Sequence, residues 1–282
     1  MSIDFISGTY FKKRCRYSVG QYDDATSPRF TFDVDESLDN RLVFVRAEYI
    51  NQLSWNINQG HISLPENFTL LTHNSDLNIT ENIRDNVLSW FPTMSYWYAQ
   101  NLNCVHERVS PLPIGIANPK WSHGNVDRFR SLSQEDNKKD NLLYVNFNIA
   151  TNKSERTYCL SHVKWSIKTD YPNYANLSDY NVFVENTQEE YLRDMSKSYF
   201  TVSPNGNGID CHKTWEALYM RSIPIVTHSV MAERFKKMGI PLLVIEDWSC
   251  FKNLELSDKL YEELWGIFNP EKLNLDFFLS NP

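Results

Sequence analysis

Several features that would assign a chain to a large protein class at once are missing from these 282 residues. No apolar run approaches the roughly 18–20 residues that a membrane-spanning helix needs. The first five residues, MSIDF, have neither the basic start nor the apolar stretch of a signal peptide. The cysteines are scattered, with no CxxC pair and no zinc-ligand spacing: Cys15, Cys104, Cys159, Cys211 and Cys250. We therefore expect a soluble, cytoplasmic protein with reduced thiols.

An excess of basic residues is also missing, because 28 Lys and Arg stand against 35 Asp and Glu, for a formal charge of −7. Proteins that bind nucleic-acid backbones usually carry a basic excess, so DNA and RNA are poor partner candidates. A few basic side chains in one cleft are still compatible with a small phosphorylated ligand. Aromatic residues make up 14% of the chain, and composition does not decide whether they pack in the core or stack against sugars.

The second half of the chain alternates predicted strands and helices. We expect strands at 142–147, 181–184, 199–202, 223–226 and 241–245, and helices at 154–168, 187–197, 210–221, 230–238 and 257–268. Such alternation is typical of a doubly wound parallel sheet with helices on both faces.

The first half is less regular but is compatible with a second α/β lobe. Its expected strands are 42–45 and 68–71, its expected helix is 81–90, and an apolar segment at 112–116 closes the half. The polar stretch at 118–140 has the composition of a linker. We therefore divide the chain into an N-terminal lobe (1–125), a C-terminal lobe (126–270) and a tail (271–282) that we expect to pack back on the N-terminal lobe.

The strongest chemical signal is the segment SPNGNGIDCHKTWEAL at 203–218, which leads from a predicted strand into a predicted helix. Its glycines allow a ligand to approach the backbone, and a helix N-terminus offers free N–H groups to an anion. His212 and Glu216 are four residues apart and share a helix face, and Asp210 is the expected N-cap. The alternative is a glycine-rich turn before a capped helix. A dinucleotide fingerprint is incomplete, since Cys211 occupies the third glycine position, and no Walker A motif is present.

Two other segments carry candidate polar groups. Arg156 lies in the first turn of the helix after the strand at 142–147, where a cation opposes the helix dipole. It is therefore either a ligand for an anion or an ordinary surface arginine. His73 and Asp76 follow the strand at 68–71, and either could act as a general base. The alternative for Asp76 is that it caps a turn or a helix.

The triplet Asp33-Val34-Asp35 is a candidate for metal binding. Glycosyltransferases of the GT-A type use a D-x-D motif after a strand to hold a divalent cation on a nucleotide diphosphate. Too few residues precede the triplet here to form a complete nucleotide-binding lobe, so it is the less favoured alternative.

The 203–218 segment, followed by SIPIV at 222–226, resembles the exostosin-like glycosyltransferases. The stretch PIGIANPKW at 113–121 and residues 152–156 are similar to the same family, and the resemblance covers roughly residues 65–250. Short relatives of this kind occur among large algal viruses and bacteria, and for a viral chain the expected location is the host cytoplasm. The resemblance implies a GT-B architecture, with two Rossmann-like lobes and the active site in the cleft between them.

The resemblance also implies roles for the residues of a donor site. Glu216 would bond the ribose hydroxyls of a nucleotide-sugar, and Arg156 would be the counter-charge of its diphosphate. Lys213 stands where the family more often has arginine, which weakens the case for bidentate phosphate binding there. The remaining donor-binding residues would be Ser203, Asn207, Gly208, Asp210 and His212.

The implied activity is the inverting transfer of a sugar from a UDP-sugar, UDP-xylose being preferred, to a hydroxyl of a glycan acceptor. Such a transfer needs a base, which we assign to Asp76 with His73 as the second choice, and stabilisation of the departing diphosphate. A helix N-terminus together with Arg156 would supply the latter without a metal or other cofactor. Two alternatives stay open: a non-catalytic glycan- or nucleotide-binding module of the same fold, and a metal-dependent GT-A enzyme that uses Asp33 and Asp35.

Overall fold

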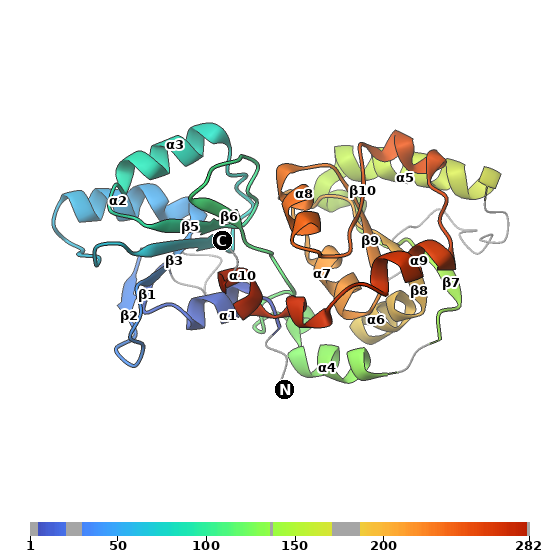
Figure 1. Cartoon of the computed structure of the whole chain (residues 1–282), viewed down its shortest axis with the longest axis horizontal. Helices are drawn as coiled ribbons and strands as arrows, with labels where there is room; N and C mark the ends of the chain where they lie inside the picture. The colour runs from blue at the N-terminus through green and yellow to red at the C-terminus, as the bar shows by residue number, and fades with distance from the viewer. Residues whose placement is uncertain (1–4, 21–29, 136–137, 171–186, 281–282) are drawn as a thin grey trace. The chain divides into compact units, whose positions relative to one another are not determined.

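The computed structural model describes residues 5–20, 30–135, 138–170 and 187–280 (Figure 1). The chain divides into two compact units. Unit 1 comprises Met1–Asn118 together with Leu273–Pro282, and unit 2 comprises Pro119–Lys272. The strand expected at 181–184 lies outside the described residues.

Unit 1 is built on a six-stranded sheet with the strand order β2-β1-β3-β4-β5-β6. Among the described strands, β2 is antiparallel to β1, and the other neighbouring pairs are parallel. The strands are β1 (Tyr17–Val19), β2 (Phe32–Val34), β3 (Leu42–Arg46), β4 (Thr69–His73), β5 (Tyr96–Ala99) and β6 (Val109–Pro111). The strands expected at 42–45 and 68–71 are confirmed by β3 and β4, whose continuous apolar runs are buried on both faces of the sheet.

The helices of unit 1 cover both faces of this sheet. They are α1 (Gly8–Lys13), α2 (Ile50–Asn58), α3 (Glu81–Trp90) and α10 (Leu275–Ser280). Figure 1 shows α2 and α3 on one side of the sheet and α1 and α10 on the other. Val45 of β3 packs in a core with Leu53 of α2, while the neighbouring Phe44 points the opposite way, toward the ring of His73. The ring of Phe11 in α1 lies against that same histidine.

Unit 2 is built on a four-stranded parallel sheet with the order β10-β9-β8-β7. Its strands are β7 (Asn141–Tyr144), β8 (Ser198–Val202), β9 (Ile223–Thr227) and β10 (Leu243–Ile245). Its helices are α4 (Val126–Gln134), α5 (Lys153–Asp170), α6 (Gln188–Ser196), α7 (His212–Tyr219), α8 (Val230–Lys237) and α9 (Asp258–Trp265). The predicted alternation of strands and helices is confirmed in this unit wherever the structure describes it.

Three expectations for unit 2 are wrong in detail. The strand expected at 142–147 ends at Tyr144, and none of the four residues of β7 is fully buried. Among the described strands, β7 is the last in the order of its sheet. The stretch expected to be a linker contains α4, whose Phe129 and Leu132 are buried. Asp210 is not the N-cap of α7, since Cys211 occupies that position and makes no side-chain capping bond.

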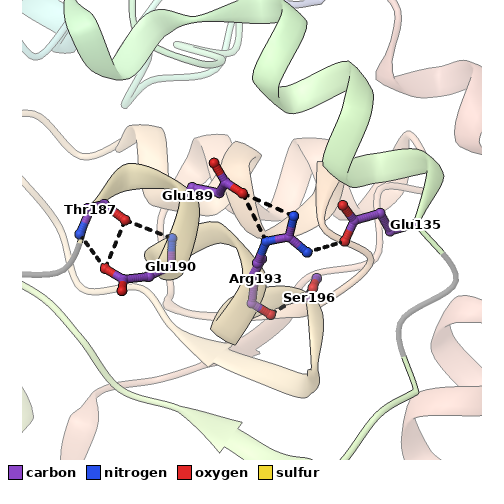
Figure 2. A network of polar contacts seen from close by, with 6 residues as sticks. All are labelled: Glu135, Thr187, Glu189, Glu190, Arg193 and Ser196. Atoms are coloured by element: carbon purple, nitrogen blue, oxygen red, sulfur yellow. Dashed lines mark hydrogen bonds and ion pairs between the residues drawn. The ribbon is translucent and has the colours of Figure 1, made fainter.

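A polar network fixes the start of α6 and ties the helix to the end of α4 (Figure 2). Thr187 and Glu190 form a capping box, each side chain accepting a hydrogen bond from the backbone N–H of the other. Arg193 donates to Glu189 on the same helix and to Glu135 just after α4, the latter at 2.6 Å. The network therefore holds the helix that contributes to the candidate site described below.

Both units are thus α/β structures with mainly parallel sheets, as expected from the sequence and consistent with a Rossmann-like fold. No helix in the described part of the chain is long and apolar enough to cross a membrane.

Candidate functional site

Polar side chains of unit 2 gather around the loop that joins β8 to α7. The Nε of Arg156, in the first turns of α5, donates to the carbonyl of Asn205 at 2.9 Å. The amide of Asn152 donates to the carbonyl of Gly206 at 2.8 Å. At the start of the loop, the hydroxyl of Ser203 bonds Thr214 of α7 at 2.9 Å. Residues of α5 and α7 therefore fix the shape of the glycine-containing loop.

Arg156 is a buried cation, with only 7% of its surface exposed. Besides its bond to the loop, its Nη1 donates to the carbonyl of Asn148 at 2.7 Å, and its guanidinium lies 5.9 Å from the ring centroid of Phe147. Among the described residues, no carboxylate forms an ion pair with it. The alternative of an ordinary surface arginine is therefore wrong. A buried charge with neutral partners is costly, and an anionic ligand would compensate it.

Gly206 lies directly against this guanidinium. A Cβ added to it would be 3.7 Å from Arg156 Nη2 and 3.7 Å from Cys211 Cβ, which is ordinary van der Waals contact. Its φ is outside the left-handed region that favours glycine. Neither backbone conformation nor packing within the protein therefore demands a glycine at position 206.

A second buried cation belongs to a chain of three side chains from α6 and α7. Lys213 Nζ donates to the hydroxyl of Tyr191 at 2.6 Å, and that hydroxyl donates to Glu216 Oε2 at 2.8 Å. Lys213 and Glu216 are 9% and 8% exposed. Helical periodicity in the sequence gives no sign that the Tyr191 hydroxyl joins two charged groups.

Burial shifts the pKa values of Lys213 and Tyr191 in this hydrogen-bonded series. The pKa of Lys213 is lowered to about 8, and burial is the main cause. Glu216 and Cys211 raise this pKa, and Arg156 lowers it. Burial also raises the pKa of the Tyr191 hydroxyl, and the charge of Glu216 adds to that shift. Lys213 is therefore mostly charged at neutral pH and loses its charge as the pH rises above about 8.

Two histidines and an exposed amide complete this region. His212, the first residue of α7, is half-buried, and Asn207 is exposed in the loop. Loss of solvent around its ring lowers the pKa of His123, while Glu216 raises it and His212 lowers it. Those effects place His123 within electrostatic reach of the site. His123 lies in the stretch expected to be a linker, and no local pattern of residues singles it out.

Asp210 supports the helix in a different way from the predicted cap. Both of its carboxylate oxygens accept from the indole N–H of Trp215, at 2.9 and 3.0 Å, and both side chains are buried. The bond ties the loop to the apolar face of α7. Asp210 and Ser203 thus shape the loop, and Gly208 is buried within it.

The two candidate bases lie in unit 1, at and beyond the end of β4. His73 is 1% exposed, its Nδ1 accepts from the backbone N–H of Asn74 at 2.8 Å, and its Nε2 bonds the carbonyl of Pro113 at 3.0 Å. Both ring nitrogens are therefore used within the protein. Asp76 is exposed, and its carboxylate accepts no hydrogen bond from the described residues. The turn is capped instead by Ser75, whose hydroxyl accepts from Leu77 N–H at 3.0 Å.

Asp33 lies in β2 and Asp35 directly after it, and β2 is the first strand in the described order of unit 1's sheet. Both side chains are exposed. Asp35 accepts from the hydroxyl and the backbone N–H of Ser37, and these bonds lower the pKa of its carboxyl. Within the described ranges, no three or more His, Cys, Asp or Glu side chains are grouped so as to hold a metal ion.

No protein-family model matches the chain, and no curated protein sequence matches it either. The resemblance to exostosin-like glycosyltransferases stays a prediction that depends on the residues quoted for it.

Proposed function

We propose that the chain is an inverting glycosyltransferase of the GT-B type, which transfers a sugar from a UDP-sugar to a hydroxyl of a glycan acceptor. The observation that carries the proposal is Arg156, a buried cation with neutral partners among the described residues, set against the Gly206 loop at the start of α7. A diphosphate supplies the negative charge that this arrangement lacks.

The donor would use the remaining polar groups of unit 2. Arg156 and Lys213 would bind the diphosphate together with the first N–H groups of α7. Glu216 Oε2 already accepts from Tyr191, so Oε1 is the oxygen that would accept from the ribose hydroxyls. Asn207 and His212 would contact the donor directly, and Gly208 would allow its close approach. Ser203 and Asp210 would act through the shape of the loop.

The chemical step would be an in-line displacement. Asp76 would take the proton of the acceptor hydroxyl, whose oxygen forms a bond to the anomeric carbon on the face opposite the diphosphate. The bond from that carbon to the β-phosphate oxygen would break, and its electron pair would stay on the diphosphate, next to Arg156. Asp76 is preferred to His73 as the base because both ring nitrogens of His73 are hydrogen-bonded within unit 1.

Ligand-dependent unfolding tests the donor class. We expect UDP to raise the thermal midpoint, because a ligand that binds only the folded state stabilises it. A larger shift with GDP than with UDP would overturn the donor class. UDP-xylose is the first nucleotide-sugar to test, followed by other UDP-sugars.

Product release separates the proposal from its alternatives. Release of UDP from the donor in the presence of an acceptor glycan is expected for a transferase, whereas UDP binding without turnover would indicate a binding module. A chelator that leaves turnover unchanged would argue against the metal-dependent alternative at Asp33 and Asp35.

A further inference from the structure

The hydrogen bonds through Tyr191 run in one direction, from the donor Lys213 to the acceptor Glu216. The ammonium of Lys213 has only hydrogens to give, and the carboxylate of Glu216 has only lone pairs. The Tyr191 hydroxyl does both, accepting at 2.6 Å and donating at 2.8 Å. Lys213 Nζ also lies 4.5 Å from the centroid of the Tyr191 ring, so the aromatic face adds to the contact.

The Tyr191 hydroxyl stands in place of a direct ion pair between Lys213 and Glu216, which α7 would allow. Lys213 and Glu216 are three residues apart on α7, a spacing at which oppositely charged side chains can pair directly. No direct ion pair between them is present in the described part of the protein, and the hydroxyl from α6 stands between them instead. Each charge thus keeps capacity for a ligand while the two remain connected.

We propose that Tyr191 is a positioning residue that couples the group binding the diphosphate to the group binding the ribose, so that the site selects an intact nucleoside diphosphate over its separate halves. The inference rests on the proposed function. Phosphate held by Lys213 would fix its ammonium on the hydroxyl, which in turn would fix Glu216 for the ribose. Hydrogen bonds in a buried chain strengthen one another, and the coupling acts equally in both directions.

The surroundings of Lys213 define how the coupling depends on pH. From α5, Arg156 opposes the charged form of the lysine, whereas Glu216 and Cys211 of the α7 region favour it. From β7, the ring of Tyr144 packs edge-on against that of Tyr191, with centroids 5.9 Å apart. Because the Tyr191 hydroxyl accepts from the ammonium, removing it would destabilise the charged form and lower the pKa of Lys213 below about 8.

Tyr144 provides a matched control. It is a tyrosine of the same cluster, and its hydroxyl accepts from the amide of Asn146 at 3.1 Å. Among the described residues, this hydroxyl makes no hydrogen bond to Lys213 or Glu216. Tyr144→Phe therefore removes one phenol hydroxyl beside the site without breaking the chain. Tyr191→Phe removes the equivalent atom within the chain and keeps the packing of the ring.

The test is calorimetric binding of UDP, uridine and inorganic pyrophosphate to the full chain. We expect Tyr191→Phe to weaken UDP binding by about tenfold, the loss typical of a hydrogen bond to a charged group, and to weaken the two halves less. The upper pH limit of UDP binding should also move to lower pH. Tyr144→Phe should leave the affinity and the pH limit as in the wild type.

A double-mutant cycle tests the coupling without relying on one variant. The losses of UDP binding free energy caused by Lys213→Met and by Glu216→Gln should be non-additive in the wild-type background. In the Tyr191→Phe background, the two losses should be additive. Additive effects in the wild-type background would overturn the inference, as would a Tyr191→Phe protein that binds UDP with the affinity and pH profile of Tyr144→Phe. Failure of the wild-type protein to bind UDP would instead overturn the proposed function itself.

Discussion

The two units differ in how the buried polar side chains near the carboxyl ends of their parallel strands are hydrogen-bonded. In unit 1, His73 ends β4 and has both ring nitrogens bonded to backbone groups. In unit 2, Arg156 and Lys213 are also buried, but their hydrogen-bond partners among the described residues are neutral oxygens. A group whose bonding capacity is used inside the protein holds the fold together, whereas a buried cation with neutral partners is suited to a ligand. Position at a strand end is therefore not enough to identify a ligand site. The hydrogen-bond partners and the charge of the side chain distinguish a ligand site from a structural contact.

Replacing Asp76 by Asn should have the largest effect on turnover. If Asp76 is the base, Asp76→Asn is expected to lower the rate of sugar transfer by about 100- to 10,000-fold, because proton removal from the acceptor is lost. UDP affinity and the thermal midpoint should stay unchanged, since the side chain is exposed. Turnover and donor binding are measured on the same preparation, and wild-type turnover would contradict the assignment.

Replacing Arg156 should have the next largest effect, on donor binding. Arg156→Met is expected to weaken UDP binding by about 100-fold, since it removes a buried cation from the diphosphate. Arg130→Met is the matched control, because Arg130 is an exposed arginine of the same unit whose charge is paired with Asp127. Equal UDP affinities for the two variants, measured by calorimetry, would remove the contrast between a ligand-binding and a structural arginine.

Replacing His73 should affect stability and not donor binding. His73→Phe keeps an aromatic ring but leaves the N–H of Asn74 and the carbonyl of Pro113 without their partner. We expect the free energy of unfolding to fall by about 2–4 kcal/mol, since each unsatisfied buried group costs about 1–3 kcal/mol. His106→Phe is the control, because His106 is only half-buried and its ring accepts one bond, from Arg108 N–H. Denaturant titration measures both. A stable His73→Phe protein with impaired turnover would assign His73 to catalysis.

The smallest expected effect is the pH dependence of donor binding. The pKa of Lys213 is lowered to about 8, so its charge is present below that pH and is lost above it. UDP affinity should therefore decline as the pH rises above about 8. Lys213→Arg should abolish the decline, because a guanidinium stays charged throughout this range. Parallel declines in both proteins would show that another group is responsible.

The elements that could be predicted are those with a strong local pattern. Local sequence pattern alone predicts the apolar strands β3 and β4 and the amphipathic helix α3. Short elements such as α1 and α4 cannot be predicted in this way, because two buried residues in a polar stretch give too weak a periodicity. Residue type favours Asp210 as an N-cap, but its carboxylate accepts from the Trp215 indole instead.

The sequence by itself determined that the chain alternates strands and helices and that the 203–218 segment joins glycines to a helix start. Lys213 and Glu216 are part of that segment, whereas only the family resemblance connected Arg156 with it. Tertiary structure alone decided that Arg156 is buried with neutral partners and that Tyr191 links Lys213 to Glu216. The physical reason is that these contacts join residues 22 to 49 positions apart, so they depend on how helices and loops pack and not on any local pattern.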